Sequence, residues 1–586
     1  MTRYILPVAC AVLLLLFFLG LPDLNHTSLL PDPSSGRRRR FCRALTRLDA
    51  VLMLVTTLFF GCVDFWNLGD TEGIESFASM NGNSVILTLD EPAEISALYY
   101  YTGVGIGNYS VEASTDGETF FPWASLQQTA ADVLKWESAA PEETVPILSL
   151  RITGYGEVWL GEAALQRSDG AFVSFSSTAP ELNDEQELVQ IYQTYRNSTY
   201  FDEIYHARTA WEHLNNIYPY EISHPPLGKI IVSLGILFFG MTPFGWRFSG
   251  TLFGVLMLPI LYVFLKRLFG STRVSLCGTL VLATDFMHYV QTRIATIDTY
   301  SVFFILLMYL FMYEFLRTGS RRGLALSGIF FGIGAACKWT SLYAGAGLAV
   351  LWLLYWIAHR KKGFRAFLKN ALFCIPFFIV IPALIYYLSY YEYGTSSGIT
   401  NPFSKAYFDI VISNQVYMFN YHRLLVAEHP YSSLWYQWIL DIRPILYYLQ
   451  YYSDGTRVSF GAWVNPVLCW GGLLALFVLL YRALFRRDRE AIFILIGYLA
   501  QLVPWIFITR LTFEYHYFPC CIFLVLALGY VFRLMENATP HANAYLAGFT
   551  ALSAAVFVLF FPALCGLPID NTLGSTLLGW LPTWPF

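Results

Sequence analysis

The sequence predicts a mainly α, polytopic membrane protein with an all-β insert, and three observations indicate this fold class. Of the 586 residues, 56% are hydrophobic and 18% aromatic, while 13% are charged, a balance foreign to ordinary soluble domains. The apolar residues form about 11–12 runs near the ~20 residues that cross a bilayer. Between residues 70 and 176, short alternating segments broken by Gly, Asp and Pro replace these runs, as in an extracytoplasmic β-sandwich of jelly-roll type.

Basic residues gather in short loops between the apolar runs. These clusters are Arg37–Arg40 with Arg43 and Arg47, Lys266 with Arg267 and Arg273, Arg317 with Arg321 and Arg322, Arg360–Lys362 with Arg365 and Lys369, and Arg482–Arg489. Because Lys and Arg are enriched in cytoplasmic loops, the alternate loops are expected outside the cell. The net charge of −4 indicates no particular partner, and we do not expect the protein to bind nucleic acids.

The charge pattern and the apolar runs predict six segments in order. They are 1–66 with two transmembrane helices and a cytoplasmic Arg-rich loop, 70–176 as the β-sandwich, 177–246 as the first outer loop with interfacial helices, 247–391 with transmembrane helices, 392–465 as a long outer loop, and 466–586 with the C-terminal transmembrane helices. The first run, 4–21, is either a span or a signal peptide, but no small-residue cleavage site follows it.

The ten cysteines lie almost wholly in or beside apolar runs, and residues 67–228 contain none. No disulfide framework is implied. This pattern fits a bacterial cell membrane better than a eukaryotic secretory compartment.

The insert contains one motif with a known relative. The piece YSVEASTDGETFFPW resembles the Ser-x-Asp-Gly-x-x-aromatic hairpin of discoidin-type jelly rolls. The resemblance covers roughly 95 residues of the insert and rests on this one motif. Many such domains bind sugars or surfaces. The alternative is a packing module that caps the membrane part, and the sequence leaves both open.

Residues 200–229, YFDEIYHARTAWEHLNNIYPYEISHPPLGK, place two adjacent acids just before an apolar stripe. Ile204, Ala207, Trp211 and Leu214 recur with helical spacing. Such a polar helix with Trp and Tyr is expected to lie flat at the membrane interface. The acids Asp202 and Glu203 would occupy its first turn, where carboxylates are favoured, so they are either a helix cap or a functional pair.

The end of this stretch predicts a second, shallow helix. Pro225 and Pro226 end the first helix. Lys229 falls in the first turn of the following helix, where the helix dipole disfavours a cation unless a nearby anion balances its charge. Snorkelling to the lipid headgroups is the alternative. Arg247 opens the following span. We therefore expect Lys229 and Arg247 to bracket a phosphate carried by a lipid, while a carboxylate takes a proton from an attacking hydroxyl.

At these residues the sequence closely resembles the protein O-mannosyltransferase family. The family consists of integral membrane glycosyltransferases of the GT-C fold that use a polyprenyl-phosphate-linked sugar. The matching pieces are FDEIYHA, HPPLGK, GWRFSGTLFGVLMLP, DFMHYVQTRIATID, CKWTSLY, HPYSSLWYQWILDIRPILYY and NPVLCWGG. One departure is the insert, because fungal and animal members carry a different soluble module in a later outer loop.

The resemblance implies roles for particular residues. Asp202 is expected to be the catalytic base, with Glu203 holding the acceptor hydroxyl. The expected donor-phosphate ligands are Lys229, Arg247, His224 and Arg293. Residues expected to position the donor or acceptor are Asp298, at the start of a span where an acid is costly, and His429, Tyr431, Trp435 and Arg443 in the long outer loop. A mutual ion pair of Arg293 with Asp298 is the alternative for those two.

The sequence thus predicts an inverting glycosyltransferase on the extracytoplasmic face of the cell membrane. It would move a sugar, with mannose the expected one, from a polyprenyl phosphate to a Ser/Thr hydroxyl of a protein or peptide. A GT-C enzyme acting on a lipid or wall glycan, a transporter and a sugar-binding sensor are the alternatives. No metal ligand set is recognised, since Glu514 and His516 are too few. A divalent cation stays possible, and the oligomeric state stays open.

Overall fold

A computed structural model describes residues 2–21 and 45–585, and it separates into two compact units. The helical unit comprises the chain up to Trp66, residues Ile222–Gly228, and everything from Gly250 onward. The β unit comprises Asn67–Glu221 and Lys229–Ser249. Most of the predicted Arg-rich loop, with Arg37–Arg40 and Arg43, lies outside the described residues.

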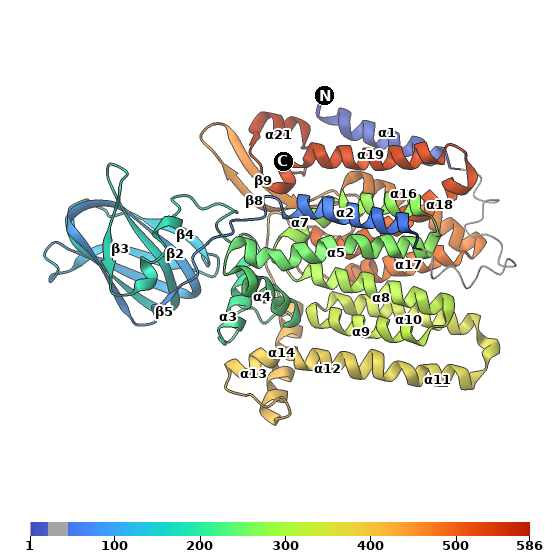
Figure 1. The fold of residues 1–586 in the computed structure, drawn as a ribbon, viewed down its shortest axis with the longest axis horizontal. Coiled ribbons are helices and arrows are strands. Elements are labelled where there is room, and N and C mark those ends of the chain that lie inside the picture. The colour runs from blue at the N-terminus through green and yellow to red at the C-terminus, as the bar shows by residue number, and fades with distance from the viewer. Residues whose placement is uncertain (1, 22–44, 586) are drawn as a thin grey trace. The chain divides into compact units, whose positions relative to one another are not determined.

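Long helices that lie alongside one another dominate the helical unit (Figure 1). Their bounds are α1 Ile5–Leu19, α2 Arg47–Phe65, α5 Pro243–Phe269 (which begins in the β unit), α6 Thr272–Ala283, α7 Phe286–Arg293, α8 Asp298–Thr318, α9 Arg321–Cys337, α10 Thr340–Ala358, α11 Phe364–Ile375, α12 Ile381–Leu388, α16 Pro466–Arg486, α17 Arg489–Leu502, α18 Phe518–Ala538 and α19 Ala542–Phe560.

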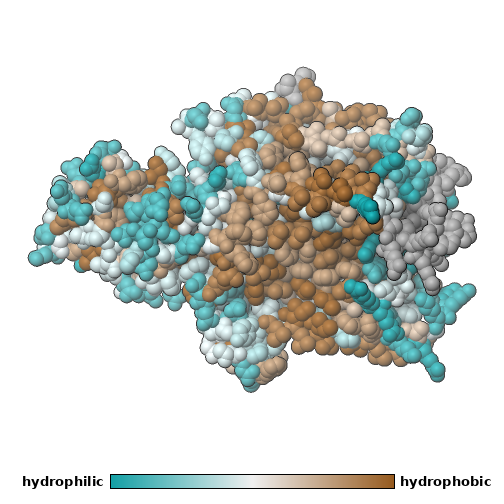
Figure 2. Space-filling model, in the orientation of Figure 1, coloured by the Kyte–Doolittle hydropathy of each residue, from teal (hydrophilic) through white to brown (hydrophobic). Residues whose placement is uncertain are grey.

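Within the described residues, nine helices are long and apolar enough to cross a membrane. A broad hydrophobic band covers the helical unit between hydrophilic margins (Figure 2). The predicted multi-pass architecture is therefore confirmed. The sequence also predicts spans near 4–21, 274–290 and 323–338. The helices found there are shorter, since α1, α6 and α9 have 15, 12 and 17 residues.

The predicted span 274–290 is not one helix. It divides at Asp285, whose carboxylate accepts a hydrogen bond from the backbone N–H of His288 and so caps the start of α7. Asp285 also accepts from the backbone N–H of Asn465, 2.8 Å away. A side chain that satisfies the free amides of a new helix ends the preceding one, and hydropathy alone does not detect this.

Helix α18 forms the centre of the helical unit. Every residue from Phe518 to Met535 except Arg533 is buried, and the helix packs against α6, α16 and α17. Gly497 of α17 permits a close approach, because a β-carbon there would lie 2.0 Å from the ring of Phe523.

The predicted outer loop 392–465 is largely structured. It contains α13 Tyr391–Ser396, α14 Lys405–Leu424, α15 Trp435–Trp438 and the hairpin of β8 Ile445–Tyr451 with β9 Thr456–Ala462. Strand β10, Ile569–Asp570, adds to β9, between two short C-terminal helices, α20 Pro562–Cys565 and α21 Asn571–Leu577. The hairpin is therefore held by residues more than 100 positions later in the sequence.

The β unit contains a seven-stranded antiparallel sheet, as an insert of this composition predicts. Its strands are β1 Ala78–Ser79, β2 Ser84–Ser114, β3 Phe121–Gln128, β4 Lys135–Ala139, β5 Pro146–Arg167, β6 Phe172–Val173 and β7 Phe175–Ser177. Several short strands were expected where β2 runs continuously. Register shifts between Thr88 and Ala93 and between Thr102 and Gly105 bend β2 without ending it, as bulges do. The jelly-roll connectivity and the discoidin likeness stay predictions.

Two further helices belong largely to the β unit, α3 Glu203–Leu214 and α4 Leu227–Phe239. Helix α3 forms at the predicted residues, but it does not present polar faces to water. Arg208 and Glu212 are both buried and paired at 2.7 Å. Trp211 packs edge-on against Phe77 and Trp159 of the sheet region, with ring centroids 5.6 and 5.7 Å away. The insert is therefore a packing partner of the helix that follows the acidic pair.

Candidate active site

The acidic pair lies where α3 begins. Asp202 is half-buried at the N-terminal boundary of the helix, and its backbone carbonyl accepts from the N–H groups of Tyr205 and His206. Glu203 is fully buried, and each carboxylate oxygen meets one nitrogen of Arg247, at 2.8 Å from Nε and 2.7 Å from Nη2.

The remaining donors of Arg247 are also occupied. Nη1 donates to the carbonyl of Leu68 at 2.9 Å, and Nη2 donates to that of Ser198 at 3.1 Å. The guanidinium stacks on the ring of Tyr200, 4.8 Å from its centroid. The side chain of Arg247 is 1% exposed. Through its hydrogen bonds it ties the start of α3 to Leu68, before the sheet, and to Ser198, after the sheet.

Lys229 has a comparable internal partner. Its ammonium donates to a carboxylate oxygen of Glu221 at 2.5 Å and to the backbone carbonyl of the same residue at 2.6 Å. The lysine side chain is 0% exposed. This ion pair fixes the start of α4 to the end of the preceding segment.

These contacts concern three residues with predicted roles, and the roles stay predictions. The structure does not support a direct phosphate contact for Lys229 or Arg247, because both cations are buried against carboxylates. Both carboxylate oxygens of Glu203 face Arg247, and a contact of Glu203 with an acceptor hydroxyl stays a prediction. The pair of Glu203 with Arg247 lies beside Asp202 at the start of α3, and the pair of Glu221 with Lys229 lies at the start of α4.

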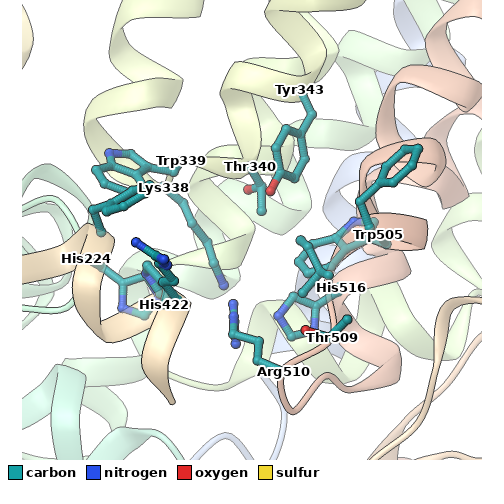
Figure 3. A pocket seen from close by; sticks show the side chains of 14 residues that line it. His224, Lys338, Trp339, Thr340, Tyr343, His422, Trp505, Thr509, Arg510 and His516 are labelled. Atoms are coloured by element: carbon teal, nitrogen blue, oxygen red, sulfur yellow. The ribbon is translucent and has the colours of Figure 1, made fainter. Parts of the chain in front are cut away.

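A pocket of 430 Å³ lies in the helical unit (Figure 3). Its walls include three strongly basic residues, three histidines and several aromatic rings, and among the described residues that line it there is no carboxylate. The basic residues are Lys338, Arg423 and Arg510, and the histidines are His224, His422 and His516. The pocket therefore favours an anion.

Lys338 and Arg510 project into this pocket from different sides (Figure 3). The ammonium of Lys338 lies 2.8 Å from each carboxylate oxygen of Asp298. The predicted residue Asp298 therefore pairs with Lys338, which is not the expected partner Arg293. One nitrogen of Arg510 donates to the backbone carbonyl of Leu511. Arg510 is half-buried, and Arg423 is exposed.

His224 is the one predicted phosphate ligand that lines this pocket. Its ring lies 5.2 Å from that of His422, and its Nδ1 lies 3.0 Å from the hydroxyl of Ser223. Burial, and secondly the neighbouring basic groups His224 and Arg510, lower the pKa of His422 to about 3. His422 is thus neutral at pH 7 and donates from Nε2 to the carbonyl of Ser223.

The other predicted residues of the helical unit lie elsewhere. Arg293 donates to the carbonyl of Trp66 and stacks over Tyr289. Four residues of the outer segment, His429, Tyr431, Trp435 and Arg443, do not line the pocket. His429 packs edge-on against Phe513 at 5.0 Å, and Arg443 donates to the carbonyl of Pro430 at 2.6 Å. The contact of His429 with Phe513 joins the outer segment to the residues before α18, and the roles in positioning substrates stay predictions.

One group of acids among the described residues has metal-ligand spacing, Glu162 with Asp184 and Glu185 in the β unit. Glu162 already accepts from the backbone N–H of Glu185, and its burial raises its pKa to about 7. Glu514 and His516 are not members of this group, and the prediction that two residues are too few for a metal site stays a prediction.

Sequence reasoning missed Lys338 and Arg510 as site residues. A signal for each existed, because Lys338 in CKWTSLY and Arg510 in PWIFITRLTFEYHYFP are lone cations between apolar runs, and such residues are costly near a membrane. What the sequence did not reveal is that the two segments line one pocket.

Comparisons with known proteins agree with this architecture. Residues 223–386 match the family described as dolichyl-phosphate-mannose-protein mannosyltransferase. Residues 407–584 match the C-terminal four TMM region of protein-O-mannosyltransferase.

Among curated relatives, the polyprenol-phosphate-mannose–protein mannosyltransferase of Mycolicibacterium smegmatis is 26% identical over 452 residues, covering 66% of this chain and 87% of the relative. The protein of the same name from Corynebacterium glutamicum is 25% identical over 458 residues, with 66% and 88% covered.

A solved structure shares the fold: the S. cerevisiae protein O-mannosyltransferase Pmt1-Pmt2 complex bound to the sugar donor. It superposes with a TM-score of 0.57 at 15% identity, over 66% of this chain and 89% of the other. The chain therefore belongs to the protein O-mannosyltransferase family of GT-C membrane glycosyltransferases.

Proposed function

We propose that this protein transfers mannose from a polyprenyl phosphate to a Ser or Thr hydroxyl of a protein at the extracytoplasmic face of the membrane. The observation that carries the proposal is the pocket of the helical unit, where Lys338, Arg423 and Arg510 meet without a lining carboxylate. Lys338 is paired with Asp298 behind the pocket wall, and a lipid-borne phosphate would add the anion that the lining itself does not supply. The names of the curated relatives supply the sugar and the class of acceptor.

The chemistry follows from the charges. The acceptor oxygen attacks the anomeric carbon as the carbon–oxygen bond to the phosphate breaks, and the polyprenyl phosphate leaves as an anion. Lys338 and Arg510 stabilise that anion. Asp202 takes the proton of the attacking hydroxyl. Attack from the side opposite the phosphate inverts the configuration of the sugar.

The supporting residues act through others. Asp298 holds Lys338 by an ion pair. The pairs of Glu203 with Arg247 and of Glu221 with Lys229 fix the ends of the segment that carries Asp202. They are positioning residues, and their substitution is expected to lower turnover together with stability.

To test the transfer reaction, the purified protein is incubated with labelled polyprenyl-phosphate mannose and a Ser/Thr-rich peptide. The peptide, lipid and water-soluble products are then separated. Label in the peptide supports the proposal. Label in a glycolipid supports transfer to a lipid, and uptake into vesicles without transfer supports a transporter.

Asp202→Asn tests the base. This variant is expected to lose transfer by at least ~100-fold, the lower range for general-base catalysis, while it folds and binds the donor. Asp454→Asn is the matched control, because Asp454 is an exposed acid that caps the turn between β8 and β9. Near-normal turnover of Asp202→Asn would remove Asp202 from the mechanism.

A further inference from the structure

A second pocket, also of 430 Å³, lies wholly within the β unit. Its walls come from three places in the sequence: residues 69–74, the strand residues Tyr101 and Trp136, and the segment 188–197. The ion pair of Asp70 with Arg196, 2.6 Å apart, joins the first and third of these walls. The backbone N–H of Asp70 also donates to the carbonyl of Arg196, so the pocket is built from fixed segments.

Two almost fully buried aromatic residues, Tyr101 and Trp136, are among its lining residues. Tyr101 and Trp136 are 2% and 5% exposed and face each other across β2 and β4 as register partners. Their rings meet edge-on with centroids 5.3 Å apart. Such residues ordinarily give their O–H and N–H groups a partner when buried.

In the described part of the chain, neither the hydroxyl of Tyr101 nor the indole nitrogen of Trp136 has a hydrogen-bond partner. The Tyr101 hydroxyl oxygen and the Trp136 indole nitrogen are also not among the fully buried polar atoms that lack a partner, so both retain some solvent accessibility. The two polar groups therefore open onto the pocket, and they are donors that a bound molecule can satisfy.

The charge of the lining narrows the chemistry of that molecule. Arg196 is the one cation among the lining residues of the described chain, and Asp70 neutralises it. Glu72 remains, together with the amide of Gln190. An anion is therefore disfavoured. A ligand with several neutral hydroxyls fits, because each hydroxyl both donates and accepts, and the lining offers donors and acceptors side by side.

We infer that this pocket is a binding site for a neutral saccharide, separate from the cationic pocket of the helical unit. Its volume lies in the range of small-molecule sites, roughly 300–1,000 Å³. The inference goes beyond the transfer reaction, and binding here requires neither the donor nor Asp202.

The test uses the full-length protein in phospholipid nanodiscs, because glycoside detergents would compete. Saturation-transfer NMR and calorimetric titration are recorded with methyl α-mannoside and an α-linked mannobiose. Glucuronate, which carries a negative charge, is the comparison ligand and is expected to bind more weakly. Saturation of the ring protons of the neutral saccharides is the expected result.

Tyr101→Phe keeps the ring and removes only the hydroxyl, so it is expected to weaken saccharide binding ~3–10-fold, the loss of one neutral hydrogen bond. Trp136→Phe gives a second, independent variant. The matched control is Tyr155→Phe, since Tyr155 is exposed on β5 and does not line the pocket.

Asp202→Asn should leave binding at this site unchanged, which separates it from the proposed function. Three results would overturn the inference: no saccharide binding, binding that both pocket variants leave unaltered, or binding of an unglycosylated peptide in place of the saccharides. In each case the pocket holds water or another partner.

Discussion

The ion pair of Glu203 with Arg247 offers the sharpest test of how the candidate site is supported. The perturbation is Glu203→Gln, which removes the negative charge but keeps the shape of the side chain. Arg247 would then hold an uncompensated charge, because its side chain is 1% exposed and its other donors already meet two carbonyls.

The magnitude follows from this burial. Solvent does not screen either partner, so the small values of surface ion pairs do not apply. Breaking a buried pair by removing one partner costs about 3–5 kcal/mol. In a unit of about 150–250 residues, 1 kcal/mol shifts the melting temperature by about 2–4 °C, so the expected decrease is roughly 6–20 °C.

The assay measures thermal unfolding and mannosyl transfer in nanodiscs for the wild type and for three variants: Glu203→Gln, Arg247→Met, and the double variant Glu203→Leu with Arg247→Met. The double variant replaces both charges by apolar groups, which is often nearly neutral for a buried pair. It should therefore recover most of the lost stability. If each single variant unfolds within about 2 °C of the wild type, a shift of ~1 kcal/mol or less, the pair is not buried as described and the reasoning fails.

Three further predictions concern the rest of the chain. Arg510→Gln should raise the apparent Kd for the polyprenyl-phosphate donor at least ~10-fold while Arg365→Gln, an exposed cation of α11, leaves it unchanged; equal affinities would exclude Arg510 from the anion pocket. The pKa of His422 is about 3 in the folded protein against an ordinary value near 6.5. The unfolded chain therefore binds the proton more tightly, and the free energy of unfolding should fall as the pH drops from about 6.5 toward 3. The His422→Asn variant should show a shallower fall in the same pH titration of stability. Trp211→Ala should destabilise the β unit by about 3–5 kcal/mol and reduce transfer, since it removes the contact between α3 and the sheet, and unfolding curves that match the wild type would contradict that packing.

Much of the fold was predictable because its signals are local. Apolar runs and basic loops predict membrane helices, since each helix must satisfy its own backbone in the bilayer. Strand alternation likewise identified the β insert. The missed break at Asp285 and the continuous β2 both involve hydrogen bonds to segments distant in the sequence, which composition does not record. Asp285 accepts from the backbone N–H of Asn465, and the register of β2 is set by its pairing with β5.

The candidate site was only partly predictable for the same reason. The sequence by itself determined a membrane-embedded family member with an acidic pair at a helix start and lone cations at span edges, because burying a charge in an apolar setting is costly and marks its position. Only the tertiary structure decided the partners of those charges. Arg247 is neutralised by Glu203, Lys229 by Glu221 and Lys338 by Asp298. Lys338 and Arg510 nevertheless both line one pocket whose described lining residues include no acid. A buried cation is satisfied by whichever carboxylate lies nearest in space, and the fold determines that distance.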